Sequence, residues 1–218
     1  AEWDDPWLLE AGFDLMYPWS SYGRLKEVWK GGPAAQFVAA EIADVAKFPA
    51  GTYRMRMTTN HDETAWDEPP VTLFGGPAGA RAAFVAMALL PGPPLLYNGQ
   101  EVESPQKLPL FEKVPVAWDQ PGAAEARSFY REVIELSRTH PSLVNGGLDS
   151  VATDHPDDVI AYRRNLVVVL VNTRPEPVAV AVEAPIEGSL DLLSGARQAG
   201  RTVRLAAHGA AVLELDLP

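Results

Sequence analysis

Two short clusters of polar residues hold side chains that could do chemistry, and each follows a stretch with strand character. The Asn-His-Asp-Glu run at 60–63 comes directly after 52–59 (TYRMRMTT), in which large and polar residues alternate. The Gln-Glu pair at 100–101 follows the short apolar segment 95–97. Carboxylates and an imidazole are acid–base groups, and β/α folds place their chemistry at the C-terminal ends of strands. Both clusters are therefore candidates for a site.

Plainer interpretations of these clusters stay open. Residues 60–63 have the types that begin helices and form turns, so the run could act as an N-cap and turn cluster. A metal site built from His61, Asp62 and Glu63 is a weaker alternative, because adjacent residues seldom ligate one ion together. Gln100 and Glu101 could cap the loop that follows them, and Glu101 could equally lie at the rim of a site.

The segments around these clusters predict helices that alternate with strands. Apolar residues recur at helical spacing in most of the segments that we assign as helices, which are 6–12, 22–29, 34–48, 78–90 and 123–140. The strands are expected at 52–59 and 95–97. Alternation of this kind is typical of an α/β architecture with a parallel sheet.

The pattern changes after Gly146 and Gly147. Four β-rich segments follow, at 159–162, 166–172, 178–182 and 203–215, and turn sequences separate them. No helical periodicity of useful length remains. We therefore expect two domains, an α/β domain at 1–145 and an antiparallel all-β sandwich domain at 148–218.

Composition narrows the range of partners. The chain has 218 residues and a net charge of −11, so its surface repels phosphate backbones and nucleic acid is not an expected partner. No apolar run reaches the ~20 residues of a membrane span, so no membrane is expected either. There are no cysteines, which excludes disulfides and thiolate metal sites. Secreted, periplasmic and cytoplasmic locations all fit the sequence.

Three motifs in order resemble the α-amylase family of glycoside hydrolases. Residues 58–63 (TTNHDE) resemble the end of the seventh barrel strand, and 90–101 (LPGPPLLYNGQE) resemble the eighth-strand segment. Residues 1–3 (AEW) and 12–19 (GFDLMYPW) resemble the fifth strand with its acid and the sixth-strand region. The resemblance covers nearly the whole chain. It implies strands 5–8 of a (β/α)8 barrel followed by a β domain.

The resemblance also implies roles for individual residues. Glu2 corresponds to the general acid/base and Asp62 to the third catalytic carboxylate, which holds substrate hydroxyls and helps to distort the sugar. His61 corresponds to the hydrogen-bonding partner beside Asp62. The cluster residue Asn60 and the tryptophans Trp3 and Trp66 are our further candidates for substrate contact, and Trp19 is another candidate sugar platform.

The sequence also departs from the family. The nucleophile is expected on a fourth strand, before residue 1, and no segment here resembles it. The Arg that often follows the NHD motif is replaced by Thr64-Ala65-Trp66. We expect no metal and no cofactor in this chain; a structural calcium would belong to the part of the barrel that precedes it.

The expected function is that of a retaining hydrolase of α-glucosidic bonds, acting on α-glucans or maltooligosaccharides in carbohydrate metabolism. This sequence would be a fragment of it. A transglycosylase of the same family and a non-catalytic, amylase-like binding or scaffold protein are the alternatives. The presence of Glu2, His61 and Asp62 together favours an enzyme, because a scaffold has no chemical need for them.

Overall fold

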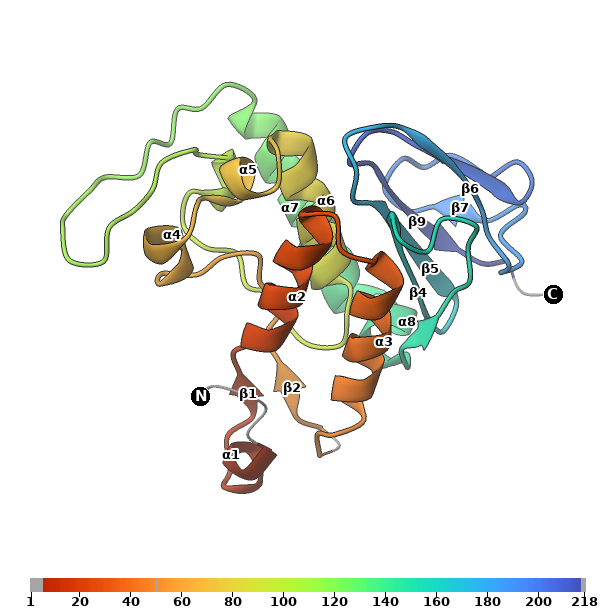
Figure 1. Cartoon of the computed structure of the whole chain (residues 1–218), viewed down its shortest axis with the longest axis horizontal. Helices are drawn as coiled ribbons and strands as arrows, with labels where there is room; N and C mark the ends of the chain where they lie inside the picture. The colour runs from red at the N-terminus through yellow and green to blue at the C-terminus, as the bar shows by residue number, and fades with distance from the viewer. Residues whose placement is uncertain (1–5, 50, 217–218) are drawn as a thin grey trace.

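The computed structural model describes residues 6–49 and 51–216 (Figure 1). Its N-terminal part consists of helices joined by short strands, and its C-terminal part is β-structure. The helices are α1 (Pro6–Glu10), α2 (Trp19–Trp29), α3 (Ala34–Val45), α4 (Glu63–Trp66), α5 (Pro70–Leu73), α6 (Pro77–Ala88), α7 (Ala123–Thr139), α8 (Pro141–Asn145) and the 3₁₀ turn η1 (Gln100–Val102). The strands are β1 (Leu15–Met16), β2 (Tyr53–Arg54), β3 (Asp149–Ser150), β4 (Val159–Arg164), β5 (Val167–Asn172), β6 (Val178–Ala181), β7 (Leu190–Asp191), β8 (Thr202–Leu205) and β9 (Ala210–Glu214).

The strands of the N-terminal part run parallel, as predicted. β1 pairs with β2 in parallel register, and Arg56 forms a parallel bridge with Pro94. The expected strand at 95–97 does not form, and only that bridge marks its place. Proline lacks a backbone N–H, so this segment offers few donors for a ladder. The bonds that remain run from the Arg56 amide to the Pro93 carbonyl (2.9 Å) and from the Leu95 amide to the Arg56 carbonyl (2.8 Å).

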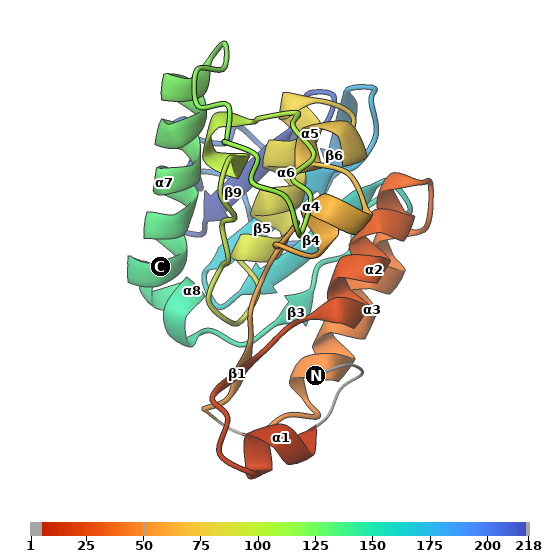
Figure 2. The same ribbon diagram turned by 90° about the vertical axis from the view of Figure 1, so that its left-hand side faces the viewer.

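The helices arise from the apolar periodicity seen in the sequence. α2 and α3 form a helical hairpin that buries Leu25 and Val28 on one helix and Phe37 and Val38 on the other. α6 is alanine-rich and almost entirely buried, and Figure 2 shows it between α7 and the α2–α3 hairpin. Its central position gives this part of the chain a common core, because both neighbours pack against it.

A long segment without regular structure joins η1 to α7. Residues 103–122 project from the body of the molecule as an extended loop (Figure 1). Phe111 in this loop is 93% exposed.

The C-terminal part forms two antiparallel sheets that face each other. One has the strand order β3-β4-β5-β9-β7, and the other pairs β6 with β8. Side chains alternate along each strand. Val168 and Leu170 share a core with the β6–β8 sheet, whereas Val167, Val169 and Val171 pack toward the helices. The expected single β-rich run at 203–215 is two strands, β8 and β9, because a turn at 206–209 interrupts it.

The five-stranded sheet packs on the helices chiefly through α3 and α6. At the C-terminal end of α7, the C-cap residue His140 also lies 3.1 Å from Glu214 of β9. The first amides of α3, at Ala34 and Ala35, donate to the carbonyls of Asp157 and Pro156 at 3.1 and 2.8 Å. These contacts satisfy donors that a helix start leaves unpaired.

Candidate active site

The predicted acid lies outside the part of the chain that the structure describes. Glu2 and Trp3 belong to residues 1–5, which precede the first described residue. Their predicted roles, and the predicted convergence of Glu2 with Asp62, therefore stay predictions. The remaining candidates, at 60–66, lie within the described residues.

The chain leading into the candidate site is buried and then reaches the surface within a few residues. Thr58, Thr59 and Asn60 are at most 1% exposed. The Asn60 side-chain oxygen accepts hydrogen bonds from the amides of Asp62 and Glu63, both at 2.9 Å. This asparagine therefore shapes the turn that begins α4, as the turn interpretation predicted. Direct contact between Asn60 and a substrate stays a prediction.

The side chains of His61 and Asp62 emerge from this turn together. His61 Nε2 lies 3.5 Å from Asp62 Oδ1, and the two side chains are 55% and 38% exposed. Both are accessible to a ligand from solvent. An imidazole beside a carboxylate can donate and accept hydrogen bonds, and these are the groups that polyhydroxylated ligands need.

Trp66 lies one helical turn beyond Asp62. The Trp66 amide donates to the Asp62 carbonyl at 2.9 Å, and the indole is 72% exposed. Residues four apart lie on the same face of a helix, so Asp62 and Trp66 present a carboxylate and an aromatic ring to the same side. Such a pair can combine hydrogen bonding with apolar contact to a sugar ring.

A polar cluster from α2 holds α4 in place, and the sequence interpretation missed it. Lys26 Nζ lies 2.5 Å from Asp67 Oδ2 and 3.8 Å from Glu63 Oε2. The Tyr22 hydroxyl donates to the same Asp67 oxygen at 3.0 Å, and Lys26 lies over the Tyr22 ring, 4.3 Å from its centre. Burial raises the pKa of Glu63, and the positive charge of Lys26 opposes that rise. Both ends of the one-turn helix are thereby fixed to α2.

The second polar cluster connects the two strand ends. Gln100 Nε2 donates to Thr58 Oγ1 at 2.7 Å, and both side chains are buried. The Glu101 carboxylate accepts a hydrogen bond from the Gly99 amide at 2.8 Å, so it caps its own turn. Glu101 thus bonds to the turn before it, whereas the capping interpretation expected a bond to the loop after it. The position of Glu101 at the rim of a site stays a prediction.

Beneath the site, a network of buried charges joins β2 and the residues after it to the helical hairpin. Arg56 donates to Glu41 at 2.7 Å, and Arg24 donates to the other oxygen of the same carboxylate at 2.7 Å. Arg54 donates to Asp44 at 2.8 Å. Burial alone would raise the pKa of Glu41, but Arg56 and Arg24 hold it below its ordinary value. Paired in this way, the charges orient the strand that leads to Asn60.

Within residues 6–49 and 51–216, no group of three or more His, Cys, Asp or Glu side chains is arranged to hold a metal ion. No helix in the same residues is both long and apolar enough to cross a membrane.

Comparison with known proteins gives one relative in sequence and several in fold. No family model matches the chain. The chain is 32% identical to the α-amylase MalA of Haloarcula japonica over an alignment of 198 residues, and the match covers 85% of this chain and 28% of MalA. It therefore spans less than a third of the length of that relative.

Solved structures with the same fold include α-amylases. A maltogenic α-amylase, AmyB of Thermotoga neapolitana, superposes with a TM-score of 0.70 and 22% identity, covering 98% of this chain and 51% of AmyB. An α-amylase from H. orenii gives a TM-score of 0.77 at 17% identity, with 99% and 52% covered. An AmyP variant in complex with maltotriose gives 0.75 at 15%, with 94% and 51% covered. These structures share the fold of this chain, and its sequence similarity to MalA shows that it belongs to the α-amylase family of glycoside hydrolases.

Proposed function

We propose that this chain is part of a retaining hydrolase of α-glucosidic bonds that acts on α-glucans or maltooligosaccharides. The observation that carries the proposal is the exposed His61–Asp62 pair at the end of a parallel strand segment, in a chain 32% identical to an α-amylase. The AmyP structure that shares its fold was determined with maltotriose, which fits an oligosaccharide ligand.

In this proposal, Glu2 protonates the leaving oxygen and then acts as the base toward water. Asp62 and His61 hold sugar hydroxyls and stabilise the distorted ring, while Trp66 and Trp3 provide apolar contact. A retaining mechanism also needs a carboxylate nucleophile about 5–5.5 Å from the acid. We propose that this nucleophile belongs to polypeptide that precedes residue 1 in a longer protein, called the parent protein below.

We further propose that residues 1–145 are strands 5–8 of a (β/α)8 barrel with their helices, and that 148–218 are a separate β-sandwich domain. The exposed apolar side chains of β1 and β2 support this arrangement. Leu15 is 43% exposed and Tyr53 is 45% exposed, although both lie on paired strands. In a closed barrel, side chains on one face of each strand are covered by the opposite strands.

The test compares three proteins on a maltooligosaccharide with an aryl leaving group. They are the parent protein, its Glu2→Gln variant and the 218-residue chain alone. We expect turnover by the parent, with the α-anomer formed first, and none by the chain alone. On an unactivated maltooligosaccharide, whose sugar leaving group needs protonation, the Glu2→Gln variant should lose more than about 100-fold in rate, because general acid catalysis contributes about 10²–10⁴-fold.

Two results would overturn parts of this proposal. Parent-like turnover by the chain alone would show that the nucleophile does not lie upstream. A parent protein that binds maltooligosaccharides without cleaving or transferring them would contradict the enzymatic function.

A further inference from the structure

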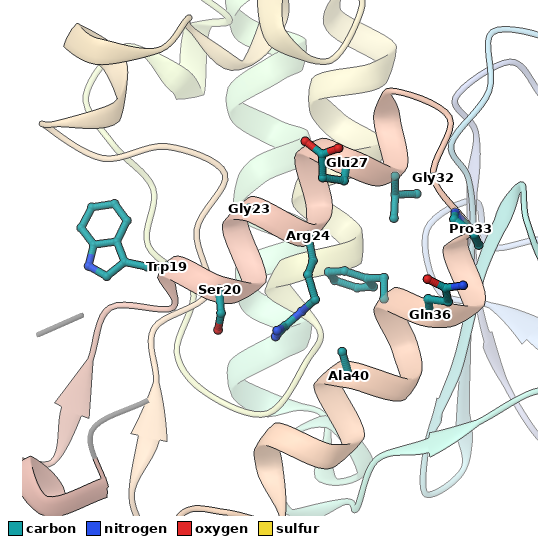
Figure 3. Close-up of a pocket in the computed structure, with 11 residues that line it drawn as sticks. Trp19, Ser20, Gly23, Arg24, Glu27, Gly32, Pro33, Gln36 and Ala40 are labelled. Atoms are coloured by element: carbon teal, nitrogen blue, oxygen red, sulfur yellow. The ribbon is translucent and has the colours of Figure 1, made fainter. Parts of the chain in front are cut away.

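The α2–α3 hairpin carries a groove that contains none of residues 60–66. The cavity has a volume of about 560 Å³, which is within the range of small-ligand sites. Figure 3 shows that residues of both helices line it, from Trp19 at one end to Pro33 at the helical turn. Val28, Phe37 and Ala40 supply apolar lining, so the groove can contact an apolar ligand surface.

Gly23 keeps the middle of the groove open. It lies inside α2, where glycine is less favourable than alanine. Its backbone does not require glycine, because its φ lies outside the left-handed range, and a Cβ at this position would meet no atom within 4 Å. Neither backbone conformation nor packing within the described residues accounts for glycine here. A small residue at such a place permits close approach by another molecule.

The charge of the groove favours a neutral ligand. Arg24 lines it; one of its terminal nitrogens is paired with Glu41 at 2.7 Å and with Asp44, and its buried Nε has no hydrogen-bond partner in the described part of the chain. The two carboxylates offset the positive charge of Arg24, and Glu27 adds a third carboxylate to the lining, so the groove disfavours a free anion. Glu27 has an exposed partner, Lys30, at 3.0 Å, and the side chain of Gln36 has no hydrogen-bond partner in the described part of the chain. Glu27 and Gln36 therefore remain available to bind hydroxyl groups.

Trp19 forms the end of the groove near the edge of the fold where the candidate site lies. It follows β1 closely, and its ring stacks on Tyr17 with centres 5.5 Å apart and planes at 26°. β1 pairs with β2, whose chain continues to Asn60 and His61. Figure 3 shows the indole projecting at this end of the groove. The stack fixes the ring, so one face of the indole can pack against a sugar at little cost in side-chain entropy.

We propose that this groove is an accessory binding site for a neutral maltooligosaccharide, separate from the candidate active site. Trp19 packs against one sugar ring, the open backbone at Gly23 admits the next, and Glu27 with Gln36 binds hydroxyls further along. The site would hold a glucan chain close to the catalytic edge without taking part in bond cleavage.

The decisive variant is Gly23→Leu in the parent protein. Leucine fills the groove, fits the backbone and favours the helix, so the variant should fold at least as well as the parent. The control is Ala39→Leu, which adds the same side chain at an exposed position of α3 outside the groove. Titration calorimetry with maltoheptaose, in an Asp62→Asn background that prevents turnover, gives the number of oligosaccharides bound per protein.

We expect Gly23→Leu to lower that number by one while Ala39→Leu leaves it unchanged. Trp19→Ala should weaken binding at this site by about tenfold. Unchanged stoichiometry in Gly23→Leu would overturn the proposal. So would a fall of several degrees in its melting temperature, because that result would mean that the protein's own chain fills the groove. Stoichiometry is measured without turnover, so failure here is distinct from failure of the enzymatic proposal.

Discussion

Lys26 Nζ lies 2.5 Å from Asp67 Oδ2, and this contact joins the last turn of α2 to the C-cap of α4. Helices as short as α4 are not stable alone, because forming the first turn is unfavourable. Its geometry must come from tertiary contacts. Lys26, Tyr22 and the Asn60 side chain provide them, and they surround the segment that carries His61, Asp62 and Trp66.

Lys26→Met should therefore weaken substrate binding more than it slows chemistry. The aliphatic part of the side chain is kept and the charge is lost, so α4 is held less firmly. We expect a rise in KM of about fivefold, corresponding to about 1 kcal/mol, with kcat nearly unchanged. Steady-state kinetics of the parent protein on a maltooligosaccharide measure both values.

The matched control is Lys30→Met, at the C-cap of α2, four positions after Lys26. Its ion pair with Glu27 has side chains that are 65% and 69% exposed, and exposed pairs contribute little. A KM change of equal size in the two variants would contradict the role assigned to Lys26.

The hydrogen bond between Gln100 and Thr58 should couple the two strand ends energetically. Thr58→Val removes the acceptor and leaves the buried Gln100 amide without it. An unsatisfied buried polar group costs about 1–3 kcal/mol, whereas removing both partners costs less. Denaturant unfolding of Thr58→Val, Gln100→Met and the double variant should give a coupling energy of about 1 kcal/mol. Strictly additive effects would show that the two side chains act independently.

Glu41 should make stability fall in acid. Its pKa is held below the ordinary value of 4.5 in the folded state, so the unfolded state binds more protons between the two values. The contribution of Glu41 to the free energy of unfolding is complete above about pH 4.5. It is lost as the pH falls through the pKa that Glu41 has in the folded state. Glu41→Gln leaves the buried Arg56 without its charged partner and should cost about 3–5 kcal/mol at pH 7.

Below about pH 4, the difference between the parent and Glu41→Gln should shrink. Urea unfolding at pH 7 and at successively lower pH measures this difference. Glu135→Gln, an exposed carboxylate on α7, is the control and should change stability by less than about 0.5 kcal/mol. A difference that stays constant down to pH 3 would contradict the assignment of this pH dependence to Glu41.

Local patterns in the sequence predicted the elements better than the contacts between them. The helices expected at 22–29, 34–48 and 123–140 correspond to α2, α3 and α7, because apolar spacing reports directly on the buried face. The parallel direction of β1 and β2 followed from the intervening helices.

Contacts between distant residues were not predictable in this way. Lys26 and Asp67 are 41 positions apart, and Thr58 and Gln100 are 42 apart. Periodicity contains no information about such pairs, since it describes one element at a time.

The strand expected at 95–97 was wrong because an apolar run predicts burial, whereas the prolines just before it restrict pairing. The side chain of Asn60 holds the turn that begins α4, and its predicted contact with substrate stays a prediction.

Arg164 should be the residue through which the β-structure stabilises the helical part. It is 2% exposed, and its guanidinium donates to the carbonyls of Leu89 (2.9 Å), Leu143 (2.8 Å) and Gly146 (2.9 Å). Burial lowers its pKa to about 10, so it stays charged at neutral pH. Arg164→Met leaves these carbonyls without their donor and should cost about 3 kcal/mol or more.

Arg164→Lys should restore little of that stability, because one ammonium group cannot reproduce the planar arrangement of donors. Thermal unfolding of both variants in the parent protein measures the loss, and product analysis on a maltooligosaccharide measures the bond cleaved. We expect a lower Tm with an unchanged product pattern, since none of these contacts involves residues 60–66. A changed product pattern at unchanged Tm would contradict a purely structural role for the β-sandwich. In that case Arg164 would determine which bond is cleaved without affecting stability.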